Sequence, residues 1–138
     1  MSKYLTAYGI TVIVFLAIDF VWLAFIARPL YADAIGHLLR DQPLFGAAGL
    51  FYAIYVIGIV IFAITPALNN GNWSTALLFG ALFGFFAYGT YDATNYATLR
   101  DWPLSISMID TAWGTALTGI SALAGFWGTR MILPNAVG

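Results

Sequence analysis

Four long apolar runs, separated by short polar segments, take up almost all of this 138-residue chain. The runs cover residues 4–27, 45–65, 74–96 and 104–132. Each is roughly twenty residues or longer, which is the length that a helix needs to cross about 30 Å of hydrocarbon. The strands of a membrane barrel would instead appear as alternating segments of about ten residues. The runs therefore predict an all-α integral membrane protein, a four-transmembrane-helix antiparallel bundle.

The composition requires the same environment. Hydrophobic residues make up 62% of the chain and charged residues only 8%, whereas ordinary soluble domains carry about 25% charged residues. Too few polar side chains are present to cover a protein surface in water, so lipid must solvate the chain. Backbone polar groups in lipid must then be satisfied inside helices. With no repeat or linker in the sequence, we expect one transmembrane domain over residues 1–138.

Prolines suggest where two of the helices end. The residue before a proline is disfavoured in helical geometry, so Arg28-Pro29 should end the first helix and Pro66 the second. Residues 28–44, between these two helices, hold several charges and an apolar stripe, which is compatible with a short interfacial helix. His37 in this segment is expected to be solvated.

The third run has an expected start and an expected contact face. Asn72 or Ser74 suits the N-cap of its helix. The spacing Gly80-x-x-x-Gly84 permits close approach of a second helix. The loop that follows this helix is short, so the third and fourth helices should be antiparallel neighbours.

Three aspartates fall inside the apolar runs. In a four-span topology, the first helix ends, the third ends and the fourth begins on the same face of the membrane. Asp19, Asp92 and Asp110 each lie seven to nine residues from that face along their helices, or about 10–13 Å deep at 1.5 Å per residue. We call these three residues the acid cluster. No lysine, arginine or histidine of the sequence lies at that depth to neutralise it.

Helical spacing adds aromatic and amide groups to the acid cluster, because residues three or four apart share a face. The candidate ligand-binding site comprises Asp19, Trp22, Tyr88, Tyr91, Asp92, Asn95, Asp110 and Trp113. An aspartate buried in a membrane usually faces the bundle interior or marks a functional path. The structural alternative is a hydrogen bond between helices that only fixes their packing.

The chemistry open to these acids is limited. Desolvation and mutual repulsion favour protonated carboxyls, and the neighbouring phenol, amide and indole groups could form a hydrogen-bonded network. Magnesium or calcium would suit carboxylate ligands, but no regular ligand spacing is present, so we predict neither a metal nor a cofactor. The absence of cysteine excludes disulfides and thiolate chemistry. A net charge of −1 provides no basic patch for nucleic acid.

Three segments of the chain resemble a known family. They are Asp19-Phe-Val-Trp22-Leu23, the stretch from Gly84 to Ala97 that includes Tyr-Gly-Thr-Tyr-Asp-Ala-Thr-Asn-Tyr, and Asp110-Thr-Ala-Trp-Gly114. Together they resemble the bacterial predicted membrane proteins called domain of unknown function 2177, over about residues 4–125. The resemblance implies a bacterial origin, and we expect a multi-pass protein of the inner (cytoplasmic) membrane. It implies no activity.

The function therefore stays open among three classes. The first is binding or transport of a small lipid-like or amphipathic ligand at the candidate site. The second is a lipid-modifying intramembrane enzyme that uses paired acids as general acid and base, although no nucleophile motif such as Gly-x-Ser-x-Gly occurs. The third is a structural or accessory subunit of a larger membrane complex. Expected partners are membrane lipids and either a second copy or a larger complex.

The orientation in the membrane is weakly indicated by charge. Arg28, Arg40 and Arg100 lie towards the face of the loops, and Lys3 and Arg130 towards the face of the termini. Because positive residues accumulate on the cytoplasmic side, we expect cytoplasmic loops and outward termini.

Overall fold

The computed structural model describes residues 1–136, and its regular elements there are all helical. They are α1 (Ser2–Val21), a π-helical turn (Trp22–Ala27), α2 (Arg28–Ile35), a 3₁₀ turn (Gly36–Leu38), α3 (Phe45–Ile59), a π-helical turn (Val60–Ile64), α4 (Thr65–Asn70), α5 (Trp73–Thr98), α6 (Leu104–Ile132) and a final 3₁₀ turn (Pro134–Ala136). The expected all-α bundle is confirmed.

Three helical stretches among these residues are long and apolar enough to cross a membrane: Ser2–Leu38, Phe45–Asn70 and Trp73–Thr98. Helix α6 is 29 residues long, but its serines, threonines and charged residues lower its mean hydropathy. The reason lies in its position. It contributes more buried residues than any other described helix, and among its hydroxyls those of Ser107, Thr118, Ser121 and Thr129 are buried.

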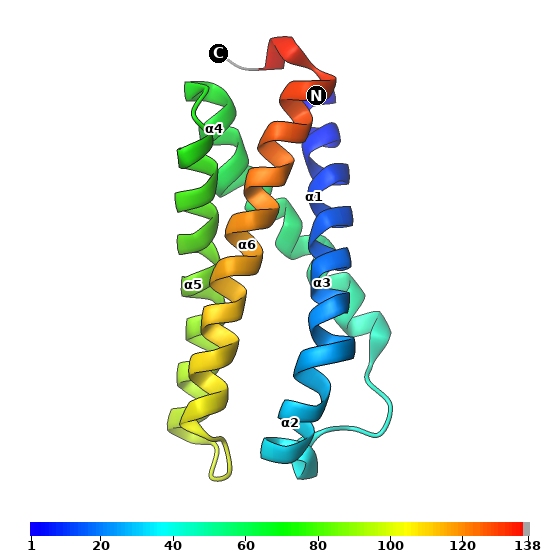
Figure 1. Cartoon of the computed structure of the whole chain (residues 1–138), viewed down its shortest axis with the longest axis vertical. Coiled ribbons are helices and arrows are strands. Elements are labelled where there is room, and N and C mark those ends of the chain that lie inside the picture. The colour runs from blue at the N-terminus through cyan, green and yellow to red at the C-terminus, as the bar shows by residue number, and fades with distance from the viewer. Residues whose placement is uncertain (137–138) are drawn as a thin grey trace.

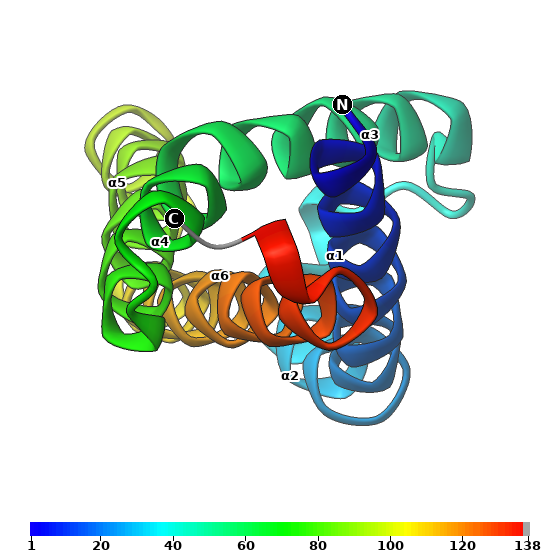
Figure 2. The ribbon, with the colours of Figure 1, turned by 90° about the horizontal axis from the view of Figure 1, so that it is seen from above.

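Helix α6 packs on α5 along most of its length and on α1 at its other side (Figure 1). Seen from above, α3 crosses the remaining side of the bundle from α1 to α5 (Figure 2). The N-terminus and the final 3₁₀ turn, Pro134–Ala136, lie at one end of the bundle, and the α5–α6 loop lies at the other (Figure 1). We call these the terminal end and the loop end.

The contact between α5 and α6 depends on glycine. A Cβ built on Gly80 would lie 2.7 Å from the Ala122 side chain, and one built on Gly84 would lie 2.7 Å from that of Thr118. Any larger residue at these positions would push the helices apart. The close helix contact expected from the Gly80-x-x-x-Gly84 spacing is therefore present.

The expected end of the first helix at Ala27 is wrong. Arg28 keeps helical dihedral angles, and α2 continues directly from α1 through the π-helical turn. The Arg28 N–H donates to the Leu23 carbonyl, five residues back rather than four. Proline removes one helical hydrogen bond and its ring crowds the carbonyl four residues earlier. The wider π turn just before Pro29 relieves that crowding, so the helix continues to Leu38.

The second helix repeats this arrangement, so its expected end at residue 65 is also wrong. The Thr65 N–H, just before Pro66, donates to the Val60 carbonyl, again five residues back. The helix then runs on to Asn70 and ends at Gly71, whose φ of 70° is left-handed and suits glycine. The Asn72 side chain accepts a hydrogen bond from the Ser74 N–H at 3.0 Å, which confirms the expected cap of α5.

The apolar core and the acids occupy different parts of the bundle. Buried residues of α3 and its π turn, from Tyr55 to Ile64, pack with Phe15, Leu117 and Phe126. By contrast, the first seven residues of α3, 45–51, are all exposed. Helix α3 is inclined and meets the other helices in the half nearer the terminal end (Figure 1). Its inclination leaves the loop-end half, where α5 and α6 carry their aspartates, less covered.

Candidate functional site

Asp19 lies in the interior of the bundle with 5% of its surface exposed. Its Oδ1 accepts a hydrogen bond of 3.1 Å from the Trp113 indole N–H on α6. The hydroxyl of Tyr52 on α3 also lies close enough to interact with this carboxyl. Trp113 stacks on Trp22 with ring centroids 4.4 Å apart and planes 10° from parallel. The stacked indoles hold the donor against Asp19 and join the π-helical turn after α1 to α6.

Asp92 on α5 is completely buried. Its Oδ2 accepts a hydrogen bond of 3.3 Å from the Thr111 hydroxyl on α6. Its Oδ1 is buried without a hydrogen-bond partner. Its backbone carbonyl accepts a hydrogen bond of 2.8 Å from the Ser107 hydroxyl. Because buried polar groups are almost always paired, Oδ1 needs a donor, which is either a proton shared with the neighbouring Asp110 carboxyl or a group from outside the chain.

Asp110 on α6 is half-buried. Its Oδ1 accepts a hydrogen bond of 2.9 Å from the hydroxyl of Tyr31 on α2. Its carboxyl lies close enough to interact with those of both Asp92 and Asp19. The structure therefore brings the three acids of the cluster together from three helices.

Tyr88 lies between the acid cluster and the apolar core. Its ring packs so closely on Gly114 that a Cβ at that position would overlap it. It meets Tyr55 edge-on, with ring centroids 6.0 Å apart, and it lies near Asp19 and Asp110. The bulk of this ring fits because position 114 has no side chain.

Tyr91 and Asn95 lie at the edge of the site. Tyr91 is 51% exposed and packs edge-on against Trp102, with ring centroids 5.8 Å apart. Asn95 lies beside Tyr91, one turn nearer the loop end. Of the residues expected in the site, these two lie on the side that is open to the surroundings.

No lysine or arginine forms a salt bridge with the acid cluster within residues 1–136, where the one contact of this kind joins His37 to Asp101 at 3.3 Å. That pair is exposed and lies at the loop end, so His37 has a partner in addition to solvent. Residues 1–136 also bring together no three histidine, aspartate or glutamate side chains in an arrangement that could hold a metal ion.

Three residues that contact the acid cluster were not expected from the sequence: Tyr31, Tyr52 and Thr111. Tyr31 reaches Asp110 only because the first helix continues past Pro29, contrary to the expected break. Tyr52 lies in a run without charge, where nothing in the sequence distinguishes its ring from the apolar side chains around it. Thr111 follows Asp110 directly, and adjacent helical positions do not share a face. Its contact with Asp92 depends on how α5 sits against α6.

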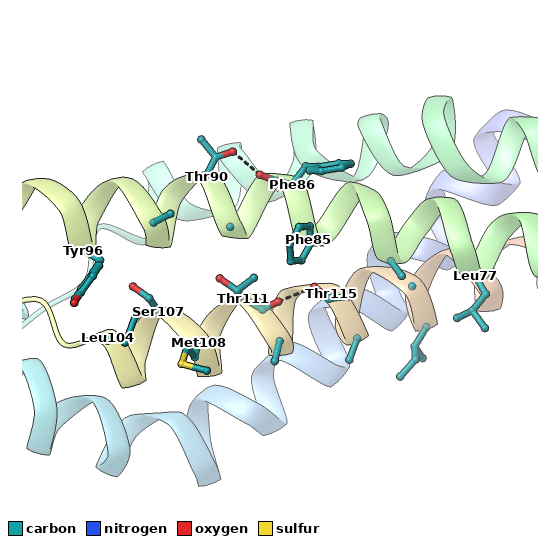
Figure 3. Close-up of a pocket in the computed structure, with 17 residues that line it drawn as sticks. Leu77, Phe85, Phe86, Thr90, Tyr96, Leu104, Ser107, Met108, Thr111 and Thr115 are labelled. Atoms are coloured by element: carbon teal, nitrogen blue, oxygen red, sulfur yellow. Dashed lines mark hydrogen bonds between the residues drawn. The ribbon is translucent and has the colours of Figure 1, made fainter.

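A groove of about 1040 Å³ runs along the outer side of α5 and α6 (Figure 3). Its lining includes Ser107 and Thr111, which both contact Asp92. A smaller cleft of about 380 Å³ lies beside the stacked Trp22 and Trp113. The acid cluster is thus flanked by an apolar groove on one side and an aromatic cleft on another.

Comparison with known proteins gives one match. Residues 4–127 match a family model described as predicted membrane protein, DUF2177. No curated protein matches the chain, and no solved structure matches it.

Proposed function

The chain belongs to the DUF2177 family of predicted membrane proteins, and we propose that it binds an amphipathic, lipid-like ligand from the bilayer. The polar head of the ligand contacts Asp19, Asp92 and Asp110. The protein is multi-pass, and the proposal places it in the inner membrane of a bacterium.

One observation carries this proposal, the unpaired Oδ1 of Asp92. The residue is fully buried and belongs to a group of three carboxyls without a cation among residues 1–136. A buried polar atom without a partner costs about 1–3 kcal/mol, and more when it is charged. A ligand head group that donates a hydrogen bond, such as an amine, would remove this cost. Because ligand binding removes the cost of the unpaired atom, that cost adds to the binding free energy.

The surroundings of the cluster favour an amphipathic ligand over a small polar one. Every helix that carries an acid is apolar on its outer face, with large exposed side chains such as Phe20, Phe86 and Met108. A ligand reaching the acids through the membrane must pass such surfaces. The half-buried Asp110 and the exposed Tyr91 mark the accessible edge of the site.

A second candidate, acid/base chemistry on a lipid, is favoured by the Asp92–Asp110 pair. Two interacting carboxyls can hold different protonation states and serve as acid and base. The Thr111 hydroxyl contacts Asp92 and the Tyr31 hydroxyl contacts Asp110, and either hydroxyl could pass a proton to a bound lipid. Conversion of a bound lipid, lost in Asp110→Asn, would replace binding as the function.

The proposal is tested with purified protein in phosphatidylcholine nanodiscs and hexadecylamine as the probe. Wild type is expected to bind hexadecylamine saturably. Asp92→Asn should weaken binding by about ten- to a hundredfold, because a hydrogen bond to a charged group contributes about 1.5–3 kcal/mol. Asp33→Asn is the matched control, since Asp33 is exposed on α2 and its substitution should leave binding unchanged.

Two outcomes would overturn the proposal. If wild type takes up no more probe than empty nanodiscs do, the cluster does not bind such a ligand. If Asp92→Asn does not accumulate in the membrane while Asp33→Asn does, the cluster serves helix packing, and the accessory-subunit hypothesis takes its place.

A further inference from the structure

We propose that the groove between α5 and α6 holds the alkyl chain of the ligand, which is therefore a long-chain lipid with a hydrogen-bond-donating amine head. This inference rests on the proposed function and adds where the apolar part of the ligand lies. The chain runs from the Thr111 level towards Leu77 and Ile120, and the head reaches Asp92.

The surface of the groove is apolar although several of its residues carry hydroxyls. The Thr115 hydroxyl donates to the Thr111 carbonyl at 2.8 Å, and the Thr90 hydroxyl donates to the Phe86 carbonyl (Figure 3). Both hydroxyls are thus satisfied within their own helices, and both side chains present methyl groups. The remaining lining is formed mainly by alanines, glycines and large apolar side chains. Such a surface suits hydrocarbon.

The groove is long enough to hold an extended alkyl chain. Its lining on α6 extends from Leu104 to Ile120, a rise of about 24 Å. The hydrocarbon of a bilayer is about 30 Å thick, so the chain of one lipid spans about half that length. The groove, with a volume of about 1040 Å³, can therefore accommodate such a chain.

The groove and the acid cluster are connected through two side chains. Thr111 lines the groove and donates to Oδ2 of Asp92. Ser107 also lines it and donates to the Asp92 carbonyl. One layer of side chains therefore separates the groove from the carboxyl whose Oδ1 lacks a partner. A protonated amine carries three N–H donors, so a head group at this point can replace the Thr111 contact to Oδ2 and also donate to the unpaired Oδ1.

The test uses hexadecylamine that carries a diazirine on its last carbon, bound to wild type in phosphatidylcholine nanodiscs and activated by light. Peptide mass spectrometry should find the label around Leu77 and Ile120. The variant Ala112→Leu/Ala116→Leu fills the groove at two exposed alanines. It should reduce saturable binding about tenfold or more, because it displaces several methylenes. Ala48→Leu, at an exposed alanine of α3, is the control and should bind like wild type.

The outcomes separate this inference from the proposed function. If Asp92→Asn abolishes binding but the label lies outside the groove, or the double variant binds normally, the groove assignment is wrong and the acid site stands. If wild type shows no saturable binding, both fail. Efficient disulfide formation between two chains carrying Ala116→Cys, with no label in the groove, would mean that a second copy covers it and would overturn the inference.

Discussion

At the scale of single residues, glycine positions decide how closely the polar side chains approach one another. Gly84 lies against the Gly114 carbonyl and Thr118, and Gly114 lies under the Tyr88 ring. The α5–α6 distance that brings Thr111 within 3.3 Å of Asp92 depends on these contacts. The glycines therefore influence the hydrogen bonding of the acids, although the two groups of residues are not in contact.

Gly84→Ala should destabilise the bundle. Its new methyl group would lie 2.7 Å from the Thr118 side chain and closer still to a backbone carbonyl, and such overpacking costs about 1–3 kcal/mol. Thermal unfolding in mild detergent would measure the loss. Gly89→Ala is the matched control, because its methyl group would meet Thr111 at an ordinary 3.7 Å. Equal stability of the two variants would show that the α5–α6 contact can relax.

At the scale of elements, the two π-helical turns allow long helices to continue through prolines that would otherwise end them. Each turn is followed by a helical residue and then by proline, at Pro29 and at Pro66. A π turn inserts one extra residue into a helix, so it also rotates the downstream residues. In the first helix this rotation sets the direction of Tyr31, which reaches Asp110.

Removing one residue from the first π turn tests this account. Deletion of Ala24 alone should lower the amount of folded protein, because Pro29 then crowds a regular turn at a cost of about 3 kcal/mol. Deletion of Ala24 together with Pro29→Ala should restore the amount of folded protein. The helix becomes regular, and the residues after the deletion keep their direction around the helix axis. Extraction in mild detergent followed by size-exclusion chromatography measures the folded fraction.

Deletion of Ala17, in the regular part of α1, is the control. It should lower the folded fraction with or without Pro29→Ala, because it rotates one half of α1 by about 100° relative to the other. If the deletion of Ala24 gave the same folded fraction with and without Pro29→Ala, the proline would not require the π turn.

At the scale of the whole molecule, the bundle has two unlike halves. The half nearer the terminal end is closed by α3 around an apolar core, whereas towards the loop end α5 and α6 carry Asp92 and Asp110. The His37–Asp101 contact joins the end of the first helix to the α5–α6 loop. Access to the acids is therefore expected from the loop-end side, which we propose faces the cytoplasm.

Cysteine labelling can test this arrangement, since the natural chain contains no cysteine. Single cysteines at Ser2 or Asn135 mark the terminal end, and single cysteines at Gln42 or Asp101 mark the loop end. An impermeant maleimide should label the first pair in intact spheroplasts and the second pair only after lysis, because three arginines favour a cytoplasmic loop end. The reverse pattern would invert the orientation, and joint labelling of Ser2→Cys and Asp101→Cys would contradict a single orientation.

The helical membrane bundle was predictable from the sequence alone, and the sequence also predicts a similar depth for Asp19, Asp92 and Asp110. Both follow from local properties, since apolar length sets the number of spans and the rise per residue sets depth. Helical spacing also placed Trp113 and Tyr88 on the faces of acids that they do lie near. These features need no knowledge of how one helix sits against another.

The partners of those acids depend on how the helices pack against one another. Tyr31 reaches Asp110 because the first helix passes through Pro29, Tyr52 reaches Asp19 because α3 is inclined, and Thr111 meets Asp92 because α5 and α6 are closely packed. Helix continuation through a proline, helix tilt and helix separation all depend on contacts between segments far apart in the chain. The periodicity of one helix carries no information about these contacts, so the free Oδ1 of Asp92 and the groove beside it became visible only in the folded molecule.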